Sequence, residues 1–109
     1  MLPSDATVPM GGTFLVMALH VLASINSDTL AHCMAGMNSA DSLLLLGDGV
    51  YVQQSAPQMT ACREVTANLY VLAPDHASRL PHLTPAVTAI DYAEWVNLSL
   101  TCGPVISWY

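Results

Sequence analysis

The stretch Asp41-Ser42-Leu43-Leu44-Leu45-Leu46-Gly47-Asp48-Gly49-Val50-Tyr51 decides the fold of this chain. Its four consecutive leucines leave no polar face, which is typical of a β-strand covered on both sides. The triplet Gly47-Asp48-Gly49 then favours a tight turn. We therefore expect a buried strand over residues 42–46 and a short helix over residues 50–54.

Strand and helix patterns alternate on both sides of this stretch. Short apolar runs predict strands, whereas apolar residues three and four positions apart predict helices. Strands are expected at residues 16–23, 42–46, 69–72, 86–90 and 105–109, and helices at residues 28–37, 50–54, 74–80 and 92–102. Such alternation is typical of βαβ units with right-handed crossovers. The predicted fold class is α/β, a three-layer α/β/α sandwich with a mostly parallel sheet of about five strands.

Capping residues are expected at the start of three helices. Ser27 precedes the helix over residues 28–37, and Asp75 follows a proline at the start of the short helix. Asp91 and Glu94 lie three residues apart, which is the spacing of a capping box. These signals predict where the helices begin.

The 109 residues are enough for one compact domain. Residues 1–16 are rich in proline, glycine and small polar residues, and we expect a disordered leader or a non-native extension, because Met17 is itself a suitable start. Residues 17–109 are expected to form the single domain. Within it, residues 55–62 are expected to be a loop, because Pro57 disfavours regular structure nearby.

The composition restricts the partners of the chain. Charged residues make up 9% of it, against roughly 25% in an average soluble domain. So few charges leave apolar area on the surface, which indicates obligate association with other subunits. The formal net charge is −6, with Arg63 and Arg79 as the two basic residues, so direct binding to nucleic acid or to an anionic membrane is not expected.

The cysteines and the first apolar run indicate a cytoplasmic protein. Cys33, Cys62 and Cys102 form no Cys-x-x-Cys pair, and their odd number fits no closed disulfide framework, so reduced thiols are expected. The run at residues 13–23 follows no lysine or arginine and contains His20, which argues against a signal peptide. It is also too short to cross a bilayer.

Three stretches in order along the chain resemble the TusB/DsrH family. Leu19-His20-Val21-Leu22 is similar to the opening strand of that family, and residues 41–51 are similar to its leucine-rich strand with an acidic-glycine-valine-tyrosine turn. The third stretch is Ile90-Asp91-Tyr92-Ala93-Glu94-Trp95-Val96, followed by Ser107-Trp108. The resemblance runs from about Met17 to Tyr109, although Gly47 stands where many members have an acidic residue.

The resemblance implies a subunit of a hetero-oligomer with TusC/TusD-like (DsrF/DsrE-like) sister subunits. Such complexes accept persulfide sulfur and pass it to a small sulfur-carrier protein downstream. In the TusB branch the destination is 2-thiouridine at the tRNA wobble position, and in the DsrH branch the sulfur belongs to dissimilatory oxidation. The main persulfide cysteine of the family lies on a sister subunit.

Cys33 is the candidate for chemistry. The resemblance implies a possible persulfide carrier here, because Cys33 matches the position of a cysteine that some members have on the first helix. A relay thiol must ionise and be accessible. Cys33 also shares a helix face with Leu30 and Met37, and a buried cysteine often serves as a small hydrophobic residue. Both interpretations stay open.

The other thiols are expected to be structural. Cys62 is expected in a loop, where the neighbouring Arg63 would lower its pKa. Cys102 is expected in the core, on one helix stripe with Trp95 and Leu98.

The histidines and glycines predict no ligand site. His20 is expected to make a structural hydrogen bond in a buried strand, whereas His32, His76 and His82 are expected to face solvent. No histidine pair has metal-ligand spacing, and the glycine turn is not a nucleotide-binding motif, so neither a metal nor a cofactor is expected.

Three functional hypotheses remain. The first is an accessory or sulfur-carrier subunit of a cytoplasmic sulfur relay, which is not itself an enzyme, with the tRNA branch preferred over the sulfur-oxidation branch. The second is a purely structural assembly subunit in which Cys33 is inert. The third is an independent thiol enzyme, for which the sequence offers no base, anion-binding loop or basic pocket.

Overall fold

The computed structural model describes residues 17–109, and the expected leader at residues 1–16 lies outside the described part. Within residues 17–109, five parallel strands form one sheet in the order β4-β3-β2-β1-β5. The strands are β1 (Leu19–Leu22), β2 (Ser42–Leu45), β3 (Asn68–Leu72), β4 (Thr88–Ile90) and β5 (Val105–Trp108). The predicted α/β fold with a parallel sheet is confirmed.

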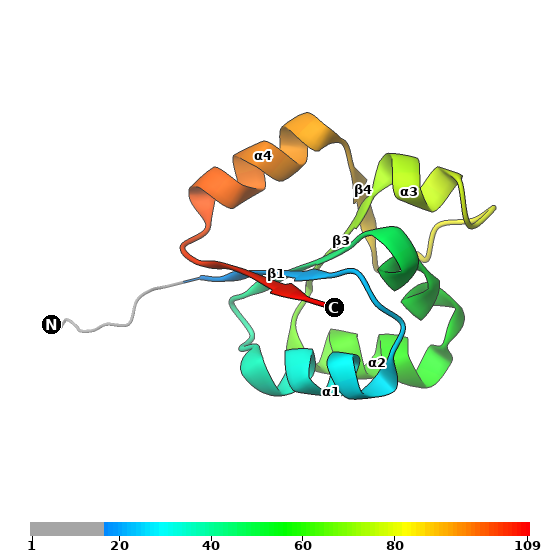
Figure 1. Ribbon diagram of the computed structural model, residues 1–109, viewed down its shortest axis with the longest axis horizontal. Helices are drawn as coiled ribbons and strands as arrows, with labels where there is room; N and C mark the ends of the chain where they lie inside the picture. Colours follow the sequence, from blue (N-terminus) through cyan, green and yellow to red (C-terminus); the bar gives the residue numbers. More distant parts are fainter. Residues whose placement is uncertain (1–16) are drawn as a thin grey trace, which may run out of the picture.

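Helical segments connect the strands. They are α1 (Ser27–Gly36), the 3₁₀ helix η1 (Gly47–Gln54), α2 (Ala56–Val65), α3 (Ala73–Ala77) and α4 (Tyr92–Thr101). Figure 1 shows α1 and α2 on one face of the sheet and α4 on the opposite face. The connection from β4 to β5 passes from one edge of the sheet to the other, and a right-handed crossover in this direction places α4 on the second face.

The leucine run lies at the centre of the sheet. β2 has neighbours on both sides, and all four of its residues are buried. Leu43 and Leu45 face a core under α1 and α2, and Leu44 faces a second core under α4. The continuous apolar pattern follows from this position, because both faces of the strand are covered.

The glycine turn after β2 allows a close backbone contact. Gly47 has a φ of 53°, in the left-handed region that glycine adopts without strain. A Cβ atom on Gly49 would lie 2.1 Å from the carbonyl oxygen of Leu22. The two glycines thus let η1 begin directly against the end of β1.

The expected loop at residues 55–62 is wrong, because most of it belongs to α2. Pro57 lies in the first turn of this helix, where the missing N–H has no intrahelical partner to lose. The Ser55 hydroxyl accepts a hydrogen bond from the Gln58 amide at 3.4 Å and caps the helix. Proline therefore marks the beginning of a helix here.

Two of the three expected caps are also wrong. Asn26, not Ser27, caps α1, since its side chain accepts from the amides of Asp28 and Thr29. The α3 helix has no side-chain cap, because it begins at Ala73 with the apolar Leu72 at the cap position. Asp75 lies inside its first turn, and its carboxylate accepts a hydrogen bond from the Gly47 amide at 2.7 Å.

The capping box of α4 is confirmed. Glu94 donates its backbone N–H to the Asp91 carboxylate at 2.8 Å, and the Asp91 amide donates to the Glu94 carboxylate at 3.0 Å. Within α4 no residue is buried, and Trp95, Leu98 and Cys102 pack against the second core from partly exposed positions. The helical layer on this face of the sheet is thus α4, which covers the second core with only partly buried side chains.

Candidate functional site

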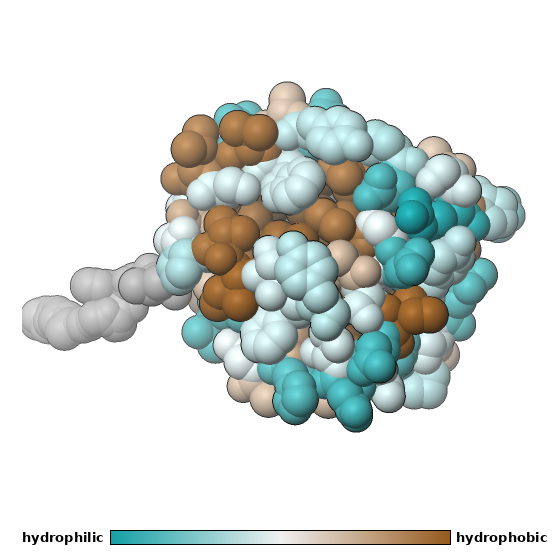
Figure 2. All heavy atoms as spheres, viewed as in Figure 1, coloured by the Kyte–Doolittle hydropathy of each residue, from teal (hydrophilic) through white to brown (hydrophobic). Residues whose placement is uncertain are grey.

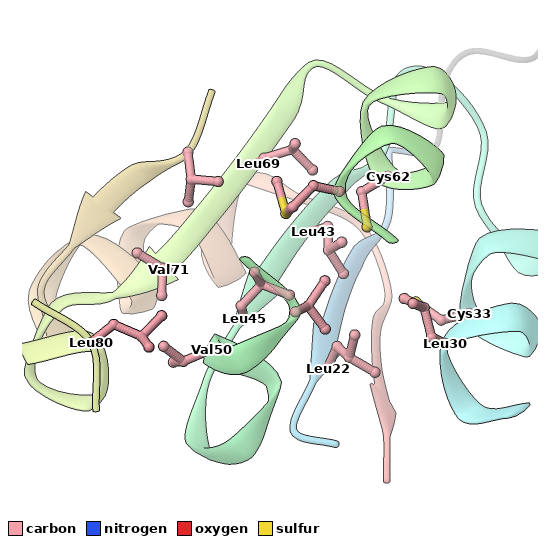
Figure 3. Close-up of a cluster of buried hydrophobic side chains, with 13 residues drawn as sticks. Leu22, Leu30, Cys33, Leu43, Leu45, Val50, Cys62, Leu69, Val71 and Leu80 are labelled. Carbon is pink, nitrogen blue, oxygen red and sulfur yellow. The ribbon is translucent and has the colours of Figure 1, made fainter. Parts of the chain in front are cut away.

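Cys33 lies inside the core between the sheet and the first two helices. The side chain is completely buried, and its Sγ lies 3.8 Å from the Met37 Sδ, one helical turn further along α1. Figure 3 shows Cys33 and Cys62 projecting from α1 and α2 into the same hydrophobic cluster as Leu30 and Leu43. In this conformation the Cys33 sulfur has no access to a donor or an acceptor of sulfur.

Burial keeps the Cys33 thiol protonated. It raises the pKa of Cys33 to about 12, and the nearby Cys62 acts in the same direction. A persulfide relay depends on the thiolate, which attacks sulfur and later leaves. At neutral pH this side chain is therefore a small hydrophobic residue rather than a nucleophile.

Cys62 lies on α2 rather than in a loop, and it is also buried. Burial raises its pKa to about 11, although the charge of Arg63 lowers it in part. The expected effect of Arg63 is present, but burial outweighs it, because Cys62 lies on a helix that turns it inward and Arg63 outward.

Cys102 is the most accessible of the three thiols within residues 17–109. It follows α4 and packs against the second core, as expected from its stripe with Trp95 and Leu98. Burial raises its pKa, a hydrogen bond with the Ser42 side chain lowers it, and the charge of Asp41 raises it. The net direction is upward, so Cys102 is no activated thiol either.

The polar network around His20 lies on the α1 side of the sheet. His20 is fully buried in β1, and its Nε2 lies 3.0 Å from the Asp41 Oδ2. On the other side of the ring, the Trp108 Nε1–H donates to the His20 Nδ1 at 3.0 Å, and the two rings stack at 16°. The predicted structural hydrogen bond of His20 is confirmed.

Chemistry fixes the tautomer of this histidine. An indole nitrogen only donates, so Nδ1 of His20 must accept and Nε2 must carry the hydrogen that is donated to Asp41. The network joins β1, β5 and the loop before β2.

Asp41 is the anchor of the network. Burial raises the pKa of its carboxyl group, but hydrogen bonds from the amides of Ala18 and Asn38 and from His20 outweigh burial and hold the pKa below its usual value. This role of Asp41 and Trp108 was not among the expectations from the sequence. An acidic residue directly before a buried strand, with a lone histidine on the neighbouring strand, was the available signal.

The carboxyl ends of the strands carry a second set of polar contacts. The amide of Gly47, the first residue of η1 after β2, donates a hydrogen bond to Asp75 in α3, the helix that follows β3. The Arg79 Nε lies 3.7 Å from the exposed Asp48 carboxylate. A carboxylate of the chain itself thus takes up the amide at this turn.

His76 is buried rather than exposed, which corrects the sequence analysis. The Gln53 Nε2 lies 3.1 Å from its Nδ1 and donates to the Val50 carbonyl, and the Gln53 Oε1 accepts from the Thr84 amide. The three residues hold the segment after α3 against η1. His32 and His82 face solvent as expected.

Neither a cluster of metal ligands nor a membrane-spanning helix is present among the described residues. Among the described side chains, no group of three or more His, Cys, Asp or Glu residues is placed to hold a metal ion. No helix between residues 17 and 109 has the length and apolarity needed to span a membrane.

Comparison with protein families decides the family of the chain. The family model described as "DsrH like protein" matches residues 23–105, which is most of the described domain. The chain belongs to the DsrH-like family. No curated protein gives a significant match.

Membership in this family indicates a general role in sulfur relay. DsrH-like proteins take part in sulfur relay, and they generally work in complex with DsrE-like and DsrF-like subunits. The resemblance to the TusB/DsrH family is thereby confirmed. The match begins just after β1 and ends at the start of β5, so it includes all three cysteines of this DsrH-like chain.

Proposed function

We propose that this chain is an assembly subunit of a cytoplasmic sulfur-relay hetero-oligomer that passes persulfide sulfur towards 2-thiouridine at the tRNA wobble position. The observation that carries the proposal is the match to the DsrH-like family over residues 23–105. In this proposal the chain is not an enzyme, and TusC/TusD-like sister subunits supply the reactive persulfide. A small sulfur-carrier protein receives the sulfur.

The state of the thiols favours an assembly role. Cys33 and Cys62 are buried and have pKa values raised to about 12 and about 11, and the pKa of Cys102 is also raised. A sulfur carrier needs the opposite, an accessible thiol with a lowered pKa. Carriage of persulfide by Cys33 stays a prediction, and it would require α1 to move away from the sheet.

The net charge supports an indirect relation to tRNA. A formal charge of −6 with two arginines offers too few cations to neutralise phosphates, so the tRNA must be bound by another protein. A DsrH-like role in dissimilatory sulfur oxidation is the alternative, since the family match is common to both branches.

Affinity purification of the tagged full-length chain from its native cells tests the proposal. We expect DsrE-like and DsrF-like subunits in the eluate, and a fall in wobble 2-thiouridine, measured by mass spectrometry of digested tRNA, in cells that lack the chain. Unchanged 2-thiouridine together with a co-purified sulfite reductase would assign the sulfur-oxidation branch. Sulfur transfer by the isolated chain, without any sister subunit, would contradict the assembly role.

A further inference from the structure

Hydrophobic side chains are exposed along the outer side of α4. Tyr92, Val96 and Leu100 follow one another at intervals of four residues and are 56%, 57% and 78% exposed. With Trp95 and Ser99 they line an apolar groove of about 350 Å³. Figure 2 shows hydrophobic atoms gathered over the C-terminal half of α4. We call Tyr92, Val96 and Leu100 the α4 stripe.

The domain does not use this stripe for its own core. The other side of the helix faces the sheet and packs against the second core through Trp95 and Leu98. A surface helix of a single domain normally has one apolar stripe and a polar face towards solvent. A second apolar stripe on the same helix therefore indicates contact with another protein.

The stripe has the geometry of a helix-docking surface. Side chains four residues apart form a ridge that fits the groove of a second helix, and this is the commonest mode of helix packing. The capping box of Asp91 and Glu94 fixes the first turn of α4, so the ridge is rigid before a partner binds.

Charge indicates which partner the stripe fits. Asp91 and Glu94 are exposed at the N-terminal end of α4, and α4 carries no lysine or arginine. Two copies of this chain would each bring a net charge of −6 and would repel one another. A different subunit, with an apolar helix and a basic side chain near Asp91 and Glu94, complements both the stripe and its acidic end.

We propose that the α4 stripe is the surface on which a DsrE-like or DsrF-like sister subunit docks through an apolar helix with a basic flank. The inference rests on the proposed function, because it names the surface that the assembly role requires. The α1 and α2 side of the sheet then remains free of this contact.

Co-expression with the sister subunits, followed by affinity purification and light scattering of the eluted complex, tests this surface. Val96→Lys and Leu100→Lys are expected to lower the amount of co-purified sister subunit by about tenfold or more, because each buries a charge in an apolar contact. Ile25→Lys is the matched control, since Ile25 is 54% exposed in the loop after β1, and it should retain the sister subunits. Circular dichroism checks the fold, and Leu100→Ser provides a milder variant.

The outcomes separate the two proposals. If the wild-type chain binds its sister subunits and both lysine variants bind them equally well, the docking surface is wrong although the assembly role stands. If the lysine variants still bind the sister subunits but abolish self-association of the isolated chain, the stripe joins two copies of this chain. That outcome overturns the inference. A wild-type chain that binds no sister subunit contradicts the proposed function itself.

Discussion

His20 contributes a polar ring to a strand that is otherwise apolar, and both of its nitrogens have partners. Asp41 accepts from one nitrogen and Trp108 donates to the other. A buried polar group is tolerated in a core when its hydrogen bonds are complete, and it becomes costly when one partner is lost. A small change at Trp108 is therefore expected to have a large effect on the stability of the fold.

Trp108→Phe is expected to destabilise the domain by about 1–3 kcal/mol, because the buried Nδ1 of His20 loses its donor and the core loses aromatic contacts. Trp95→Phe is the control, since Trp95 lies half-buried against the second core and its indole makes no hydrogen bond among the described residues. Urea unfolding followed by circular dichroism measures both variants. Equal stability losses in the two variants would show that the hydrogen bond to His20 contributes nothing.

The thiols give a prediction for pH dependence. Burial raises the pKa of Cys33 to about 12 in the folded chain, whereas the unfolded chain releases the proton near the ordinary thiol pKa of 9.0. The unfolded state therefore binds fewer protons between these values, so stability is complete below about pH 9 and falls as the pH rises towards 12. Cys33→Ala is expected to flatten this fall in unfolding experiments between about pH 8.5 and 10.5.

Alkylation provides an independent measurement at the same residues. In the native chain at about pH 8, iodoacetamide should modify Cys102 before Cys33 and Cys62, because the last two are buried and remain protonated. Peptide mass spectrometry identifies the modified thiol. Rapid labelling of Cys33 would instead reveal an exposed, reactive carrier cysteine and would revive the sulfur-carriage hypothesis.

At the scale of elements, the sequence predicts the positions of the strands better than the residues at which the helices begin. All five strands lie within or close to their expected residues. The apolar runs of the central strands β1, β2 and β3 reflect burial in a parallel sheet, whereas the edge strands β4 and β5 are apolar but mostly exposed. The capping box of α4 is equally local and is confirmed. The prediction of a loop at residues 55–62 fails because it treats Pro57 as a helix breaker, whereas proline is favoured in the first turn of a helix.

Long-range contacts explain the remaining errors at this scale. Asp75 follows a proline and was expected to cap α3, but the helix begins two residues earlier, and the Asp75 carboxylate bonds to the Gly47 amide, 28 residues earlier in the chain. His76 looks like a surface residue in sequence, but Gln53 and the segment after α3 cover it. Neither contact has a local pattern, so single-sequence reasoning does not find them.

Gly49→Ala is expected to destabilise the fold by about 3 kcal/mol or to prevent folding, because the new Cβ meets the Leu22 carbonyl and the backbone of η1 must shift. Gly36→Ala is the matched control at the last residue of α1, where the nearest atom is 3.4 Å away on the Trp108 ring. Thermal unfolding compares the two. A Gly49→Ala variant as stable as the control would contradict the close approach of η1 to β1.

At the scale of the whole molecule, the two faces of the sheet differ. The face under α1 and α2 holds a large buried core with both inert thiols, whereas α4 on the other face has no buried residue and carries an apolar stripe towards solvent. The low charge content predicts apolar surface, and the structure places part of it on α4 and part on the edge strand β5, where Val105 and Ile106 are exposed. An exposed apolar stripe of this kind is suited to association with another protein.

Reconstituted sulfur transfer tests the central claim most directly. Purified sister subunits are loaded with ³⁵S persulfide, and the label on the downstream carrier protein is measured with the wild-type chain, with Cys33→Ala, and without the chain. The account predicts transfer that needs the chain but is unchanged in Cys33→Ala. Transfer that proceeds at the full rate without the chain, or that fails with a folded Cys33→Ala chain in an intact complex, would contradict the assembly role.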